Sequence, residues 1–145
     1  MATLFTRIID GEIPGRFVWS DDLCVAFLTI GPLQLGHAMV VPRVEVDQWV
    51  DLEPDVAAHL FEVARHIGLA QREEFGAKRI GMLIEGYEVP HAHVHVWPSQ
   101  SGADFNPGNV LTDVADADMD EAAARLRSRL RAHGHPQVAE SGARS

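Results

Sequence analysis

The hydrophobic positions of the chain follow two periods, and the longest regular stretch has the period of a helix. Over residues 53–75 the apolar side chains recur every three or four positions, at Val56, Leu60, Val63 and Ile67. This spacing places them in one stripe along a helix. Pro54 stands where the first helical turn tolerates proline, and Gly76 follows where helices commonly end. The pattern predicts a long amphipathic helix from about residue 53 to residue 75.

Two shorter stretches have the same period. Near the start of the chain, helical spacing is shown by Leu4, Phe5, Ile8 and Ile9, and the turn-forming sequence GEIPG follows them. Near the end, one face of a helix expected from about residue 118 to residue 133 is formed by Met119, Ala122, Leu126 and Leu130. We therefore expect a short N-terminal helix and a C-terminal helix in addition to the long one.

Five other runs are short and rich in β-branched or aromatic residues, which is typical of strands. They cover residues 16–20, 24–30, 37–42, 79–86 and 91–97. A turn at Asp21 and Asp22 joins the first two runs, and residues 31–36 and 101–109 are expected to be loops. Strands before and after one long helix predict an α+β fold with an antiparallel sheet of about five strands, the long helix and the C-terminal helix.

Composition narrows the class of protein. A chain of 145 residues is expected to form a single domain, which we place at residues 1–134, followed by a disordered tail at residues 135–145. The net charge of −9 disfavours binding to long nucleic acid, which requires a basic surface. Cys24, the one cysteine, is expected to be a small buried side chain. The sequence has no apparent signal peptide or membrane-spanning run, so we expect a cytoplasmic protein without membrane partners.

The run from residue 91 to residue 97, HAHVHVW, holds three histidines at alternate positions. A chain with 8 histidines in 145 residues would contain such a run by chance about 0.02 times. Successive side chains of a strand point to opposite faces, so His91, His93 and His95 would share one face, while alanine and valine residues share the other. The apolar face can pack on the long helix, and the imidazoles can line a cavity.

Three kinds of site fit this arrangement. Two of the histidines could bind zinc with a third ligand from elsewhere. Alternatively, the middle imidazole acts as a nucleophile while its neighbours handle protons and charge. Alternate side chains of a strand lie about 6.5–7 Å apart, which suits groups reaching different oxygens of a phosphate better than groups meeting at one ion. A structural role, with hydrogen bonds at a sheet edge, explains one histidine more readily than three in register.

The sequence resembles the histidine triad (HIT) family of nucleotide-binding hydrolases and transferases, in particular its HINT-like branch. The residues that carry the resemblance are the start IIDGEIP, the segment GHAMVVP that contains His37, and the triad itself. The family motif is His-φ-His-φ-His-φ-φ, where φ is apolar, and residues 91–97 match it at every position. The resemblance extends from about Leu4 to Pro98.

This resemblance implies a mechanism and a set of site residues. His93 would attack the α-phosphorus of a nucleotide conjugate, of the phosphoramidate or dinucleoside polyphosphate type, and form a nucleotidyl-histidine intermediate. His95 would bind the phosphate oxygens or the leaving group, while His91 and His37 would support and orient. The implied substrate-binding positions are Leu4, Phe5, Ile8, Phe27, Thr29, Ile30 and Glu88. We expect no cofactor and no metal, and the resemblance implies a homodimer that acts on a small-molecule nucleotide.

Three departures from the family pattern bear on activity. Thr29 stands where the family commonly has an aspartate that binds the ribose hydroxyls. The segment before the triad is the short IEGYEVP, in which Glu88 would repel a phosphate unless its side chain faces the surface or pairs with a histidine. Alternatively, Glu85 and Glu88 would recognise a cationic leaving group. The N-terminal stretch lacks the Cys-x-x-Cys pair of zinc-binding relatives, and Glu45 stands where those have a histidine. Two rival functions remain: a nucleotide-binding module with little turnover, and a metal hydrolase that uses two histidines.

Overall fold

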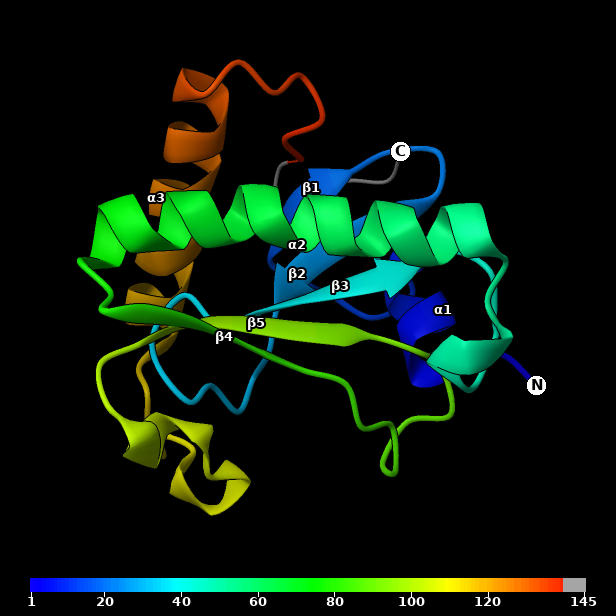
Figure 1. Ribbon diagram of the computed structural model, residues 1–145, viewed down its shortest axis with the longest axis horizontal. Helices are drawn as coiled ribbons and strands as arrows, with labels where there is room; N and C mark the ends of the chain where they lie inside the picture. The colour runs from blue at the N-terminus through cyan, green and yellow to red at the C-terminus, as the bar shows by residue number, and fades with distance from the viewer. Residues whose placement is uncertain (140–145) are drawn as a thin grey trace.

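A five-stranded antiparallel sheet with strand order β1-β2-β3-β5-β4 forms the centre of the computed structural model, which describes residues 1–139 (Figure 1). The strands are β1 (Phe17–Ser20), β2 (Cys24–Leu28), β3 (Ala38–Pro42), β4 (Arg79–Leu83) and β5 (Val94–Ser99). The helices are α1 (Leu4–Ile9), α2 (Pro54–Phe75) and α3 (Asp116–Ala132), with short 3-10 helices η1 (Trp49–Asp51), η2 (Gly102–Phe105) and η3 (Pro107–Asn109) between the larger elements. The expected α+β class is confirmed, with its five strands, one long helix and C-terminal helix.

Helix α2 covers one face of the sheet (Figure 1). It begins at Pro54 and is closed by Gly76, whose φ of 60° is left-handed. Of the expected apolar stripe, Leu60, Val63 and Ile67 belong to the main hydrophobic core, and Val56 is partly buried against it. Removal of this apolar surface from water is the main force that holds helix and sheet together. None of the helices formed by residues 1–139 has the length and apolar character needed to span a membrane.

The opposite face of the sheet is covered differently. A second hydrophobic cluster forms there between α1 and the strands β1, β2 and β3, and it includes Phe5, Ile8, Phe27 and Met39. Thr3 caps α1, because its side chain accepts a hydrogen bond from the backbone N–H of the first helical turn. The same face carries a cavity beside α1.

The triad segment differs from the strand expected over residues 91–97. Strand β5 begins only at Val94, so two of the three histidines precede it. The reason lies in the backbone: Pro90 has no N–H, and the N–H of Ala92 donates to the carbonyl oxygen of Val46 outside the sheet ladder. The alternation of faces is kept nevertheless, because the residues between and after the histidines are buried in the core beneath α2, at Ala92, Val94 and Val96.

Residues 135–139, which were expected to belong to a disordered tail, make defined contacts in the structure. The backbone N–H of Ser20 donates to the carbonyl oxygen of Gln137 (2.8 Å), and Ala139 is buried. Strand β1 is an edge of the sheet, and an edge strand presents backbone groups that a neighbouring segment can pair with. The segment after α3 therefore runs along β1. The remainder of the expected tail, residues 140–145, lies outside the described residues.

Candidate active site

A cavity of about 630 Å³ opens beside α1 on the face of the sheet that carries the histidines. His93 and His95 line it. It is also lined by every residue expected to bind substrate, namely Leu4, Phe5, Ile8, Phe27, Thr29, Ile30 and Glu88. Ile30 is 92% exposed and therefore lies at the rim. A concave, mainly apolar site with a few convergent polar groups is suited to a small molecule.

His93 presents one nitrogen to this cavity. Its other nitrogen, Nδ1, lies 2.7 Å from the carbonyl oxygen of His91, which can only accept a hydrogen bond. Nδ1 therefore carries the ring proton, and Nε2 keeps its lone pair. The ring is 7% exposed and stands edge-on to Phe5, with 4.8 Å between the ring centroids. A fixed, unprotonated nitrogen thus lies beside an apolar wall.

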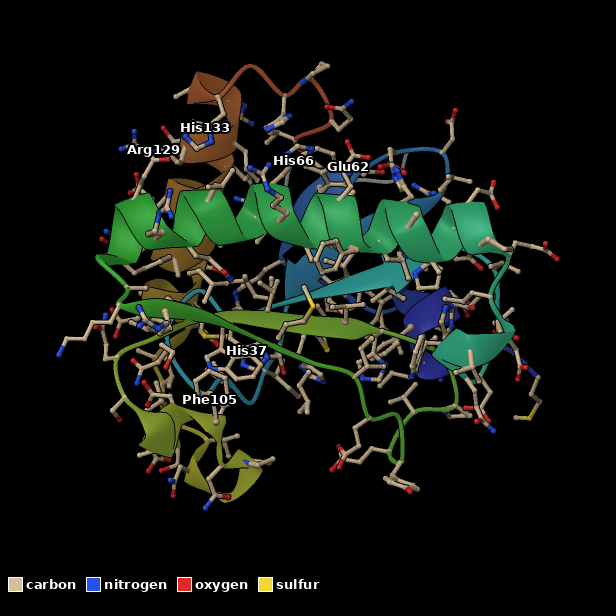
Figure 2. The ribbon with its side chains drawn as sticks, in the orientation of Figure 1. His37, Glu62, His66, Phe105, Arg129 and His133 are labelled. Atoms are coloured by element: carbon tan, nitrogen blue, oxygen red, sulfur yellow. The ribbon has the colours of Figure 1, made fainter. Side chains whose placement is uncertain are left out.

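His37 and His95 form a second hydrogen-bonded unit, in which the ring protons lie on Nε2 and not, as in His93, on Nδ1. The backbone N–H of Leu33 donates to Nδ1 of His37 (3.0 Å), so the proton of neutral His37 is on Nε2. That Nε2 lies 2.9 Å from Nδ1 of His95, which must accept, so the proton of His95 is on its own Nε2. His37 lies on the side of the sheet away from α2 (Figure 2). Through this chain, His95 brings an N–H donor to the cavity where His93 brings a lone pair.

His91 is fully buried and stands behind the cavity. Its Nε2 lies 2.7 Å from the carbonyl oxygen of Pro42 and therefore donates, while its Nδ1 lies 2.7 Å from the hydroxyl group of Thr3. Because the ring proton of neutral His91 is on Nε2, Nδ1 can only accept, and the Thr3 hydroxyl donates to it while accepting from the backbone N–H of Thr6. Helix α1, which forms an apolar wall of the cavity, is in this way tied to the triad segment.

Burial keeps the histidines of the site uncharged. Burial, and after it the neighbouring His95, lowers the pKa of His37 to about 3. Burial, and after it His93, lowers the pKa of His95 to about 4. The pKa of His93 is also lowered by burial, against the opposing effects of its backbone hydrogen bond and of the carboxylates of Glu85 and Glu88. At neutral pH all three rings are neutral, as the proton positions require.

The charged side chains that line the cavity are mostly acidic. Glu85 and Glu88 are exposed, and both line it. Arg16, the one basic side chain among the lining residues of the described chain, is already paired. Its Nε lies 2.8 Å from the carboxylate of Asp120, and its Nη2 lies 3.2 Å from that of Asp116. A ligand therefore meets carboxylates and neutral imidazoles, in contrast to sites that hold several phosphates with basic groups.

Several residues of the site were not expected from the sequence. Asp120 lines the cavity from α3, beyond the end of the family resemblance, so no motif marks it. Met39 lines the cavity from β3 and reads in the sequence as an ordinary strand residue. The position of Thr3 before an apolar run is typical of a helix cap, which is the signal that could have indicated it.

The residues present do not fit the structural zinc site of zinc-binding relatives. Such a site needs soft or imidazole ligands with open lone pairs. Here Glu45 accepts a hydrogen bond from the backbone N–H of Thr3 (2.7 Å), and the Thr3 side chain is bonded to His91. Because the N-terminal stretch has no cysteine, hydrogen bonds alone join these residues.

Within residues 1–139, one other group brings potential ligand atoms together. Atoms of Asp21, Cys24 and His59 lie within 4.8 Å of one another. The Asp21 carboxylate, however, already accepts from Trp19 (2.7 Å) and is 2.7 Å from Nε2 of His59. Burial would raise the pKa of Asp21, but these hydrogen bonds prevail and lower it to about 2, while burial raises the pKa of the Cys24 thiol. The group is best described as a hydrogen-bonded turn between β1 and β2.

Comparison with known proteins places the chain in a family. The family model of the HIT domain matches residues 10–102, more than half of the chain, and the chain therefore belongs to the HIT domain family. It is similar to an uncharacterized HIT-like protein from Methanocaldococcus jannaschii, with 28% identity over 130 residues that cover 86% of this chain and 98% of that protein. It is also similar to the crystal structure of a zinc-bound histidine triad family protein from Mycobacterium smegmatis. That match has a TM-score of 0.78 and 26% identity, and covers 92% of this chain and 96% of that one.

A relative with a named activity is found among plant proteins. A bifunctional bis(5'-adenosyl)-triphosphatase/adenylylsulfatase from Arabidopsis thaliana is 27% identical over 122 residues. The matched region covers 81% of this chain and 65% of the plant protein. The family to which the chain belongs thus includes nucleotide hydrolases.

Proposed function

We propose that the protein is a nucleotide hydrolase or nucleotidyl transferase that attacks the α-phosphorus of a nucleotide conjugate. The observation that carries this proposal is the opposite hydrogen bonding of two adjacent rings, from which their proton positions follow. His93 offers a lone pair at Nε2 and His95 offers an N–H at Nε2, with ring centroids 4.9 Å apart at one cavity. A phosphoryl group that meets both would find a nucleophile for its phosphorus and a hydrogen-bond donor for an oxygen or the leaving atom.

The proposed reaction has two steps. In the first, the lone pair of His93 Nε2 forms a bond to the α-phosphorus while the bond from phosphorus to the leaving group breaks. The leaving atom takes a proton that enters from water in the cavity, and the N–H of His95 stabilises the developing negative charge. In the second step, water attacks the phosphorus, the phosphorus–nitrogen bond breaks, and one proton returns to the solvent. The hydrogen bond from His93 Nδ1 to the carbonyl of His91 strengthens while the ring carries positive charge.

The charges around the cavity favour a neutral or cationic leaving group. Glu85 and Glu88 line it, and the guanidinium of Arg16 is paired with carboxylates. A polyphosphate leaving group would bring several negative charges close to these side chains, whereas an amine would not. We therefore propose that adenosine phosphoramidates are better substrates than dinucleoside polyphosphates. Measuring the turnover of both with one preparation of the protein tests this preference.

Mass spectrometry of the intact protein after brief mixing with an adenosine phosphoramidate tests the mechanism. We expect an acid-labile adduct of one adenylyl group that maps to His93 and is lost in His93→Ala. His133→Ala is the control, since His133 directly follows the last residue of α3 and lies outside the cavity (Figure 2). That variant should keep both adduct and turnover. An adduct on His91 or His95, or full turnover by His93→Ala, would contradict the assignment.

A nucleotide-binding module with little turnover is the second candidate function. Thr29 is the observation that favours it, because a threonine cannot offer the two charged acceptors of an aspartate to a ribose. Tight binding of AMP with neither adduct nor product would establish this function instead. The metal hydrolase gains no support, because His93 alone among the four site histidines presents an open lone pair. Nε2 of His95 carries its ring proton, and both nitrogens of His91 and of His37 are engaged in hydrogen bonds.

A homodimer joined through β4 is part of the proposal. Strand β4 is an edge of the sheet, and an edge strand can pair with a second strand. Beside it lies a groove of about 230 Å³ with the apolar side chains of Phe61, Leu69, Ile80 and Met82, of which Phe61 is 61% exposed. A second copy paired along β4 would cover this groove and join the two sheets. Sedimentation velocity, which distinguishes the mass of a dimer from that of a monomer, tests this assembly. The cytoplasmic location stays a prediction from the sequence.

A further inference from the structure

The cavity lacks a carboxylate at position 29, but another carboxylate lines the same cavity. Thr29 lines it from just beyond β2, and its hydroxyl oxygen accepts the backbone N–H of Gly31 (3.2 Å). Asp120 lines it from α3. Helix α3 lies outside the segment matched by the HIT domain, residues 10–102. Asp120, which is far from Thr29 in the sequence, thus supplies a carboxylate to the cavity that lacks one at position 29.

Arg16 connects these two parts of the cavity wall. Its backbone carbonyl oxygen accepts the N–H of Leu28 (3.1 Å), the residue before Thr29. Its guanidinium holds Oδ1 of Asp120 at 2.8 Å. The second carboxylate oxygen of Asp120 has no hydrogen-bond partner within residues 1–139. Asp120 is therefore anchored through one oxygen near the end of β2, while the other oxygen can accept hydrogen bonds from a ligand.

The parts of a nucleotide differ in what they can offer to such a carboxylate. The phosphate is repelled by it and belongs with the imidazoles of His93 and His95. The base is flat and suits the apolar walls formed by residues such as Phe5 and Phe27. The sugar hydroxyls are neutral donors, and their hydrogen bonds to a carboxylate are charge-assisted. The sugar is therefore the part of the ligand that matches Asp120.

We propose that Asp120 accepts hydrogen bonds from the sugar hydroxyls of the nucleotide, in place of the side chain at position 29. This assignment rests on the proposed function, because it names the group that binds the sugar of the same substrate. Thr29, with one hydrogen to donate, adds a weaker contact. Helix α3, which packs against α2 and β1, then also contributes to specificity.

Calorimetric titration with AMP and with 2',3'-dideoxy-AMP tests this assignment. Asp120→Asn should weaken the binding of AMP by about tenfold, the effect of losing one charge-assisted hydrogen bond, and should not weaken the binding of the dideoxy ligand. Asp116→Asn is the matched control. Asp116 pairs with Arg16 from the same helix (3.2 Å) but does not line the cavity, so this variant should bind both ligands like the wild type.

The outcomes separate this assignment from the proposed function. Equal losses in Asp120→Asn and Asp116→Asn, or equal losses for AMP and the dideoxy ligand, would overturn the role of Asp120 and leave the hydrolase standing. If the wild-type protein neither binds AMP nor forms an adduct, the proposed function fails and the assignment fails with it. A lower melting temperature of Asp120→Asn would not disturb the test, because both ligands are compared on the same variant.

Discussion

The hydroxyl group at position 29 is a weaker partner for a ribose than a carboxylate would be. The side chain of Thr29 already accepts a hydrogen bond from Gly31 and has one hydrogen to donate. Thr29→Asp should tighten AMP binding by about tenfold, because a charge-assisted hydrogen bond contributes about 1.5–3 kcal/mol before desolvation. Titration with 2',3'-dideoxy-AMP, which has no hydroxyl to donate, should show no gain.

The same substitution is more informative in the background of Asp120→Asn. There the new carboxylate at position 29 should restore the affinity for AMP that the loss of Asp120 removes. Thr29→Asn in that background is the control, since it has nearly the shape of aspartate without the charge, and it should restore little. A gain that is equal for AMP and the dideoxy ligand would show that the effect is not recognition of the sugar.

Helix α1 acts on the triad segment through a single hydroxyl group. Thr3→Val keeps the shape of the side chain but removes the donor to Nδ1 of His91 and the cap of α1. A buried nitrogen without its partner costs about 1–3 kcal/mol, and a lost cap costs about 1 kcal/mol more. We expect a lower melting temperature, reduced turnover, and altered ¹⁵N chemical shifts of the His91 ring that report a changed proton position.

Two further variants distinguish the hydrogen bond from general weakening of the helix. Thr3→Ser keeps the hydroxyl group and should restore both turnover and the ring shifts of His91. Arg7→Gly, at an exposed position of α1, weakens the helix but leaves the Thr3 hydroxyl and its partners in place, so it should leave these shifts unaltered. If the ring shifts in Thr3→Val equal those of the wild type, the hydroxyl group does not determine where the His91 proton resides.

Helices and motifs that depend on neighbouring residues could be predicted from the sequence. Contacts between segments that are far apart in the sequence could not. The length of α2 could be predicted because its apolar residues form one continuous stripe that faces the sheet. The triad motif indicated that His93 and His95 belong to the candidate site. The late start of β5 depends on a hydrogen bond from Ala92 to Val46, which no local pattern shows. The place of Asp120 depends on how α3 packs against β1, and one aspartate among several in its helix carries no signal of its own.

Buried histidines make the stability of the whole molecule depend on pH. A histidine of the unfolded chain has a pKa of about 6.5. In the folded protein, burial lowers the pKa of His37 to about 3 and that of His95 to about 4. Below pH 6.5 the unfolded state therefore binds more protons than the folded state, and the free energy of unfolding falls as the pH falls. From pH 6.5 to pH 5 the loss should be about 2 kcal/mol for each of these histidines.

Urea unfolding at pH 7, 6 and 5 measures this dependence. The range lies above that in which most carboxylates titrate, so the histidines dominate the change. His37→Gln removes one of the buried rings and should reduce the slope, although the variant is expected to be less stable at pH 7. A free energy of unfolding that stays constant from pH 7 to pH 5 would contradict the neutral rings and the proton positions derived from them.

The hydrogen-bonded chain from Leu33 through His37 to His95 has a closed inner end. It terminates at a backbone amide, which holds its proton at neutral pH, so no proton can reach His37 and His95 through this chain from the interior. Protons must therefore reach these rings from the solvent, on the side where the exposed Glu85 and Glu88 line the cavity. His93 also lines a second hollow, beside Trp49 and Tyr87. A substrate bound in the main cavity therefore does not cover every approach of water to this ring.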